Sequence, residues 1–325
     1  MKNKKIFYIL AFTFVAVTVI ILFVFINQQA SAISNYLLIS FREIDYISIF
    51  DPGSNQVVKK IHLDLPYPYL IRKVLRYNNT IYIIAAHQVI LIGMNGSIKK
   101  IVDINDTVIE GIIKNGNLYT TGLIQVAPCN SSNMTKAYKS YITVFNPSLL
   151  QLSKLEFDQH EFYGLAVLNN SIFVSSFFDS KIYEIREGKI IKNIQLPEES
   201  YPSQVFDFGD KIIVIGRKEI FILPTSLSNF DILINESVCN YYVRAFIYNN
   251  RLYATCFTGN KTIVYDLIQN KLIKQINTTL PYYVWGFKDK IYVTSAFAKK
   301  LYIINPNTDE LITTIDFNEP PRVVG

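Results

Sequence analysis

One column of mostly polar residues recurs at a fixed place in the sequence and is the best candidate for chemistry. It lies nine residues before a repeated aromatic or aliphatic position and reads Lys73, Glu110, Gly164, Gln204, Arg244 and Tyr283. Alignment of the last residues of the chain adds Arg322 to this column. Arginine can bind a carboxylate or phosphate through two parallel hydrogen bonds.

The column therefore predicts a site for a small polar or anionic ligand at the mouth of a channel. Arg244, Arg322 and Lys73 would form its cationic side. Tyr283 would form a wall. The alternative is that these side chains only face water in the channel.

The elements that would position this column come from an internal repeat. A turn, a hydrophobic residue, an aromatic or aliphatic key residue and an alternating strand recur along the chain. The key residues are Leu37, Tyr82, Tyr119, Phe173, Ile213, Tyr253 and Tyr292. Their spacings are 45, 37, 54, 40, 40 and 39 residues. A period near 40 with about four short strands per unit is typical of a β-propeller. The fold class is therefore all-β, a seven-bladed propeller.

The two ends of the repeat region predict how the ring closes. The chain enters on a second-position strand near Tyr36, with no inner strand before it. The last residues, 320–325, match residues 281–286, the inner strand of the seventh unit. We expect the C-terminal strand to complete blade 1, which would protect exposed sheet edges.

One unit carries a family resemblance. Residues 291–315 read IYVTSAFAKKLYIINPNTDELITTI and closely resemble the YVTN-type β-propeller repeat. That family includes archaeal surface-layer propellers and bacterial periplasmic relatives. The resemblance implies a seven-bladed propeller in an extracellular or periplasmic setting, but it implies no particular reaction.

The N-terminal segment predicts a membrane anchor. Residues 6–26 are an uncharged run of 21 residues, preceded by Lys2, Lys4 and Lys5. A helix of that length spans a bilayer core of about 30 Å. Positive residues stay cytoplasmic, so the body would lie outside the cell. The predicted organisation is a basic stub (1–5), a transmembrane signal-anchor (6–26), a linker (27–34) and the propeller (35–325). Cleavage near Ala30-Ser31-Ala32, which would release a secreted body, is the alternative.

Acceptor motifs for N-glycosylation also favour export. Nine such motifs occur, at Asn78, Asn95, Asn105, Asn130, Asn133, Asn169, Asn235, Asn260 and Asn277. Six of these are expected on the face that carries the loops from outer to inner strands: Asn105, Asn130, Asn133, Asn235, Asn260 and Asn277. Cys239 and Cys256 should lie near that same face and can form a disulfide, whereas Cys129 paired with Cys239, or free buried thiols, are the alternatives.

Several kinds of chemistry have no sequence support. The net charge is +6 but no basic run suggests nucleic acid. No HExxH, CxxC, P-loop, GxGxxG or GxSxG motif occurs. An acidic metal cluster of the lactonase type would have only Glu110, with Asp207 nearby on another strand. Asp158, His160 and Glu161 are interpreted as a solvated loop. Neither a cofactor nor a bound metal is expected.

The sequence thus predicts a membrane-tethered extracellular binding or scaffold module at a cell or virion surface. Its partners would be the membrane, through residues 6–26, and a small polar or anionic ligand, a glycan or a surface protein. The alternatives are a channel-mouth hydrolase or lyase and a structural surface-layer component.

Overall fold

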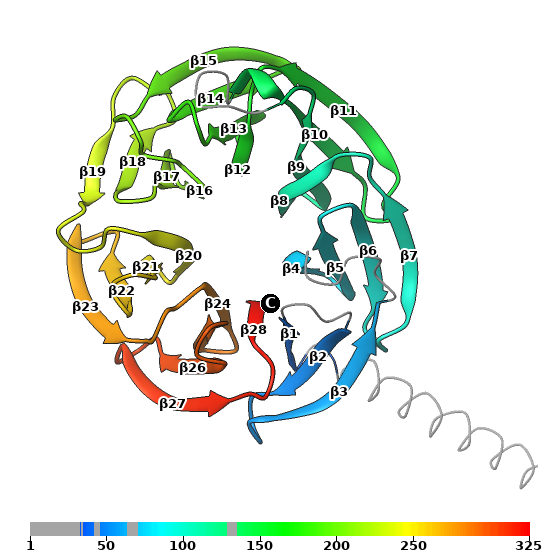
Figure 1. The fold of residues 1–325 in the computed structure, drawn as a ribbon, viewed down its shortest axis with the longest axis vertical. Coiled ribbons are helices and arrows are strands. Elements are labelled where there is room, and N and C mark those ends of the chain that lie inside the picture. The colour runs from blue at the N-terminus through cyan, green and yellow to red at the C-terminus, as the bar shows by residue number, and fades with distance from the viewer. Residues whose placement is uncertain (1–32, 34, 42–45, 64–70, 129–134) are drawn as a thin grey trace, which may run out of the picture.

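A computed structural model describes residues 33, 35–41, 46–63, 71–128 and 135–325. Seven four-stranded antiparallel sheets are arranged as blades around a central axis (Figure 1). The seven-bladed propeller predicted from the repeat is confirmed.

Each blade has an inner, a second, a third and an outer strand. The inner strands are β28 (Pro321–Val324), β4 (Ile71–Tyr77), β8 (Thr107–Lys114), β12 (Phe162–Leu168), β16 (Gln204–Phe208), β20 (Tyr242–Tyr248) and β24 (Tyr283–Phe287). The second strands are β1 (Leu37–Phe41), β5 (Thr80–Ala85), β9 (Asn117–Gln125), β13 (Ser171–Ser176), β17 (Lys211–Ile215), β21 (Arg251–Cys256) and β25 (Lys290–Ser295). The third strands are β2 (Tyr46–Asp51), β6 (Gln88–Gly93), β10 (Tyr138–Phe145), β14 (Lys181–Arg186), β18 (Ile220–Pro224), β22 (Lys261–Asp266) and β26 (Lys300–Asn305). The outer strands are β3 (Gln56–His62), β7 (Ile98–Asp103), β11 (Gln151–Asp158), β15 (Lys189–Gln195), β19 (Asp231–Ile234), β23 (Lys271–Asn277) and β27 (Glu310–Asp316). A short 3₁₀ helix, η2 (Thr135–Ala137), precedes β10.

The hydrophobic core follows the second and third strands of each blade. β5 and β6 are buried along almost their whole length, whereas β7 at the rim is mostly exposed. Middle strands are covered on both faces by neighbouring blades, so they read as continuous apolar runs. All seven key residues of the repeat lie in second strands, as predicted.

Two of the key tyrosines also tie neighbouring blades together. The Tyr82 hydroxyl donates to the carbonyl of Pro147, 2.8 Å away in the outer turn of blade 3. The Tyr253 hydroxyl donates over 2.7 Å to the Asp309 carboxylate in the outer turn of blade 7. At these two positions the tyrosine therefore fills the core and also satisfies a polar group of the neighbouring blade.

The ring closes through the C-terminus, as the sequence predicted. β28 pairs antiparallel with β1, with Ile39 opposite Val324. Leu38 and Gly325 exchange two backbone hydrogen bonds, of 2.8 and 2.9 Å. The partly buried Arg76 guanidinium donates to the carbonyls of Ile33, Tyr36 and Gly325 and so ties both ends of the ring to blade 2.

The molecule has two faces that differ in their connections. Inner strands begin at the top face, which carries the loops from outer to inner strands and those between second and third strands. They end at the bottom face, which carries the turns between inner and second strands and those between third and outer strands. Ile33 and Asn35 lie at the bottom face, where they contact Arg76 and Lys288 at the ends of inner strands.

None of the described residues forms a helix that is both long and apolar enough to cross a membrane. The predicted anchor, residues 6–26, lies outside the described residues, as do Cys129, Asn130 and Asn133.

Candidate functional site

The predicted column contains an ion-pair bridge that crosses the channel. Glu110 on β8 accepts from Lys73 on β4 at 2.5 Å and from Arg244 on β20 at 3.0 Å. β8 and β20 belong to blades 3 and 6, on opposite sides of the ring. The bridge therefore spans the central axis and divides the channel into a top and a bottom part.

One carboxylate faces two cations in this bridge, so one positive charge is left over. Burial disfavours the ionised form of Glu110, but the cations of Lys73 and Arg244 outweigh it and hold the pKa of this carboxyl below its ordinary value. Burial also opposes the charge of Arg244, while Glu110 raises its pKa above the usual value. The ionised forms of Glu110 and Arg244 are thus favoured, and the Glu110 carboxylate is shared between Lys73 and Arg244.

The other members of the column have different roles. The Gln204 side-chain oxygen accepts from the backbone amide of Ala245 at 2.7 Å, which links blades 5 and 6. Tyr283 is buried, with 4% of its surface exposed. The Arg322 guanidinium lies 5.9 Å from the centre of the Tyr282 ring. The structure thus brings Lys73, Glu110 and Arg244 together. Gln204 instead forms a hydrogen bond between two neighbouring blades.

A cavity of about 360 Å³ opens above the bridge, at the top face. Its lining includes a second column, Arg72, Ile109, Tyr163, Ser203, Val243 and Tyr282, each one residue before the predicted column. Five inner strands carry a bulge or register irregularity at this level: β28, β4, β8, β12 and β20. An extra residue at a bulge redirects the neighbouring side chains, so the preceding residue faces the cavity.

The top cavity is cationic. Arg72, Arg217 and Arg244 line it, and none of the described residues around it is Asp or Glu. The Arg72 Nε atom is buried without a hydrogen-bond partner. Burial, followed by the charges of Arg322 and Arg244, lowers the pKa of Arg72. Of the three arginines only Arg244 contacts a carboxylate, that of Glu110, which it shares with Lys73, so the cavity has an excess of positive charge.

Aromatic rings form the remaining wall of the top cavity. Tyr163 stacks on Phe177 with ring centres 4.7 Å apart, and Phe177 contacts Tyr201 at 5.1 Å. The Arg217 guanidinium lies over the rings of Tyr201 and Tyr241, at 5.7 and 5.0 Å. Rings and guanidinium groups interact favourably and present both apolar and cationic surface to a ligand.

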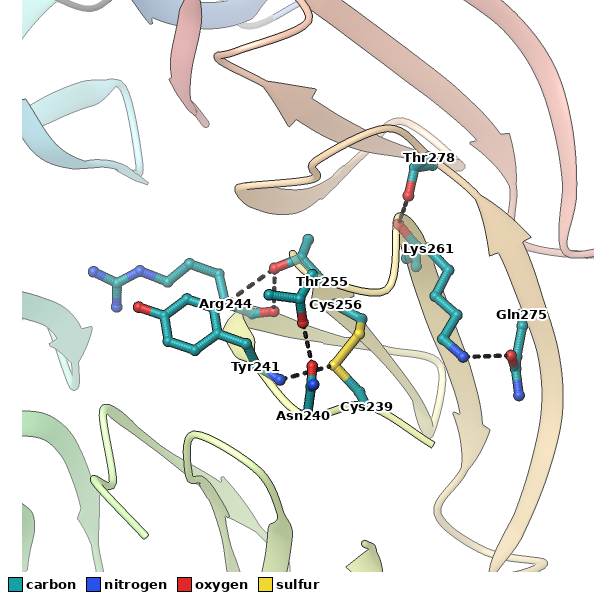
Figure 2. Close-up of a disulfide and its surroundings, with 11 residues drawn as sticks. Cys239, Asn240, Tyr241, Arg244, Thr255, Cys256, Lys261, Gln275 and Thr278 are labelled. Atoms are coloured by element: carbon teal, nitrogen blue, oxygen red, sulfur yellow. Dashed lines mark hydrogen bonds between the residues drawn. A yellow bond between two sulfur atoms is a disulfide. The ribbon is translucent and has the colours of Figure 1, made fainter. Parts of the chain in front are cut away.

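A disulfide braces one side of this cavity. Cys239 and Cys256 are joined, with Cα atoms 5.8 Å apart; this is the pairing that the sequence put first. The backbone amide of Tyr241 contacts the Cys239 sulfur at 3.4 Å, and Thr255 bonds both backbone groups of Arg244. Figure 2 shows the side chains of Tyr241 and Arg244 on the side of this segment away from the outer strand. The crosslink therefore holds the segment that carries four residues of the cavity wall, Tyr241, Tyr242, Val243 and Arg244.

Part of the loop before β12 is not solvated, which corrects the sequence interpretation. Asp158 is exposed, but Glu161 has only 2% of its surface exposed and its Oε2 atom has no hydrogen-bond partner. Burial and the nearby Asp179 raise the pKa of Glu161 to about 8, against weaker opposing hydrogen bonds that include one from Tyr163. His160 stacks on Phe162 at 5.3 Å. A neutral Glu161 behind Tyr163 leaves the positive charge of the cavity intact.

The described glycosylation motifs are all accessible. Seven of the nine asparagines are described, and each is exposed. Asn105, Asn235, Asn260 and Asn277 lie at the top face, and Asn78, Asn95 and Asn169 lie at the bottom face.

Comparison with known proteins supports the fold and leaves the family open. No protein-family profile and no curated protein matches the sequence. Among solved structures, apo AztD from Citrobacter koseri is 12% identical, with a TM-score of 0.60 over 89% of this chain and 97% of its own. A streptogramin B lyase is 14% identical, with a TM-score of 0.63 over 78% of this chain and 86% of its own. A catalytically inactive histidine-to-alanine variant of virginiamycin B lyase from Staphylococcus aureus, solved with quinupristin, is 15% identical, with a TM-score of 0.61 over 77% and 85%. The chain is thus similar in fold to AztD and to the two lyases.

Proposed function

We propose that the protein is an extracytoplasmic binding propeller, tethered through residues 6–26, that takes a small anionic ligand in its top cavity. The observation that carries this proposal is the charge of the cavity: three guanidinium groups and no carboxylate among the described lining residues. A ligand with a carboxylate, sulfate or phosphate group would satisfy the buried Nε atom of Arg72. The tyrosine wall suits a ligand that also has an apolar or planar part.

Binding is favoured over lyase chemistry by the positions of the histidines. The virginiamycin B lyase structure shows a variant that is inactive without one histidine. Here His62 is exposed on β3, His87 is exposed in a loop, and His160 packs between the rings of Phe162 and Tyr183. None of the three lines the top cavity. No histidine is therefore found among the described residues that line the cavity where a ligand would bind.

The arrangement of the faces is consistent with the proposed tether. The chain reaches β1 from the bottom face, beside Arg76 and Lys288. An anchor at residues 6–26 would therefore hold the bottom face toward the membrane and leave the top cavity open to the exterior. Four exposed glycosylation motifs at the top face fit this orientation.

The test uses a pair of dyes that differ only in a sulfonate group: 8-anilinonaphthalene-1-sulfonate and N-phenyl-1-naphthylamine. Arg72→Gln should weaken binding of the sulfonate dye about 10- to 100-fold, the loss expected for one charge-assisted hydrogen bond. Binding of the neutral dye should not change. The matched control is Arg186→Gln, which alters an exposed arginine on β14, away from the cavity.

Equal affinity of the Arg72→Gln and unmodified proteins for the sulfonate dye would refute the proposed site. So would equal losses in the Arg72→Gln and Arg186→Gln variants. Added salt should also weaken binding of the sulfonate dye, because the cavity opens to solvent and mobile ions screen its charge.

A further inference from the structure

A second cavity, of about 440 Å³, lies below the ion-pair bridge at the bottom face. It shares no lining residue with the top cavity. Its wall is largely apolar and includes Ile113, Phe206, Phe246, Ile247 and Trp285. These five side chains are only partly buried, so a good deal of apolar surface faces the opening.

The charged groups of this bottom cavity neutralise one another. Lys73 is paired with Glu110 at the floor, and Lys114 is paired with Asp207 at 2.5 Å at the rim. The Lys114–Asp207 pair joins β8 to β16 and so passes over blade 4. Two cations and two anions leave the cavity without net charge, in contrast to the cationic cavity above the bridge.

We propose that the bottom cavity is a second binding site, for an uncharged and mainly apolar small molecule such as an aliphatic chain. Cavities of this size accept ligands of small-molecule dimensions, and apolar walls release water favourably when an apolar ligand replaces it. A charged ligand gains little there because each charged group already has a partner. The site stands on its own geometry and does not depend on an anionic ligand in the top cavity.

The ligand of the bottom cavity can come from two sources that share the same chemistry. One is a free amphiphile in solution. The other is a lipid chain, because the chain enters the propeller at this face and the proposed anchor would bring it near a bilayer. Both sources offer a hydrocarbon chain, and the experiment can separate them.

Trp285 makes the cavity directly observable, because it is the single tryptophan of the protein. Its ring lies 4.7 Å from that of Phe246 in the cavity wall. Occupation by 1-decanol, which is spectroscopically silent, should shift Trp285 emission to the blue and protect it from quenching by acrylamide. In the series hexanol, octanol and decanol, each added methylene should lower the dissociation constant about fourfold.

The variants test whether the site lies where the structure puts it. Ile247→Glu places a charge in the apolar wall. It should weaken the binding of decanol at least about tenfold, because burying an unpaired charge is costly. Ile268→Glu is the matched control, because Ile268 belongs to the same blade but is 69% exposed in its outer turn. Arg72→Gln should leave decanol binding unchanged, so that failure here can be told apart from failure of the proposed anionic site.

Two results would overturn the proposal: no saturable response of Trp285 to any of the alcohols, or equal effects of the Ile247→Glu and Ile268→Glu substitutions. A response to neutral phosphatidylcholine vesicles as well as to decanol would support the proposal with a lipid as the source. A response to decanol alone would support it with a free amphiphile as the source.

Discussion

Replacing Glu161 with glutamine should stabilise the protein, and the gain should grow with pH. Glu161 is almost completely buried before β12 and its pKa is raised to about 8, against an ordinary value of 4.5. In the folded protein this carboxyl is therefore protonated at neutral pH, whereas in the unfolded chain it is ionised. Folding must then take up a proton, which costs free energy as the pH rises.

The magnitude follows from the gap between the two pKa values. One pKa unit corresponds to about 1.4 kcal/mol, so the full cost is about 5 kcal/mol above pH 8. At pH 7 the cost is about 3 kcal/mol, and near pH 5.5 it falls to about 1 kcal/mol. Because the pKa is raised on folding, stability is greatest below pH 4.5 and is lost as the pH rises toward 8. Glutamine has a similar shape but cannot ionise, so the variant escapes this cost.

The assay is reversible unfolding by urea at several pH values between about 5 and 8, with the disulfide kept oxidised. The difference in unfolding free energy between Glu161→Gln and the unmodified protein should rise by about 2 kcal/mol from pH 5.5 to pH 7. Glu187→Gln is the control, because Glu187 is exposed in a turn of the same blade. A difference that stays constant with pH, or one that Glu187→Gln reproduces, would show that Glu161 ionises normally and that the reasoning is wrong.

Three further predictions concern the disulfide, the blade interfaces and export. Serine at both Cys239 and Cys256 should lower the unfolding free energy by about 3 kcal/mol, because the crosslink closes a loop with a separation of 17 residues; denaturant unfolding checks this. The same change should weaken binding of the sulfonate dye, which a dye titration checks. Asp309→Asn should destabilise the junction of blades 6 and 7 by about 2–3 kcal/mol, because the buried carboxylate accepts from both Tyr253 and Arg251; an unchanged melting temperature would contradict this. Mass spectrometry of the protein from its native membrane should find residues 6–26 retained and glycans on exposed motif asparagines; a mature N-terminus near residue 33 would instead indicate cleavage.

The two cavities differ in charge and in polarity along the channel axis. The Lys73–Glu110–Arg244 bridge separates a cationic, aromatic chamber from a neutral, apolar one. Breaking the bridge at Glu110 would leave two buried cations without a partner, so such a variant would confound stability with binding. The variants chosen above lie outside the bridge for this reason.

The sequence by itself determined the architecture. Seven key residues at a period near 40 predicted the blades and their second strands, because each blade must bury the same two middle strands against its neighbours. The match between the C-terminal residues and an inner strand predicted ring closure, and the positions of Cys239 and Cys256 indicated their pairing. These features depend on local pattern and on the order of strands, which a sequence records directly.

Only the tertiary structure decided which side chains face the channel and what they meet there. Pairing is irregular in five inner strands, and the top cavity is lined mainly by the residues one before the predicted column, such as Arg72 and Tyr163. Lys73, Glu110 and Gln204 of the predicted column line the bottom cavity. The partner of Arg244 is Glu110, which lies 134 residues away across the ring. Glu161 is buried beside Tyr163 and Asp179, although the sequence of its loop is polar. A bulge, a cross-channel pair and the burial of one carboxyl all depend on the ring being closed, and no local pattern encodes them.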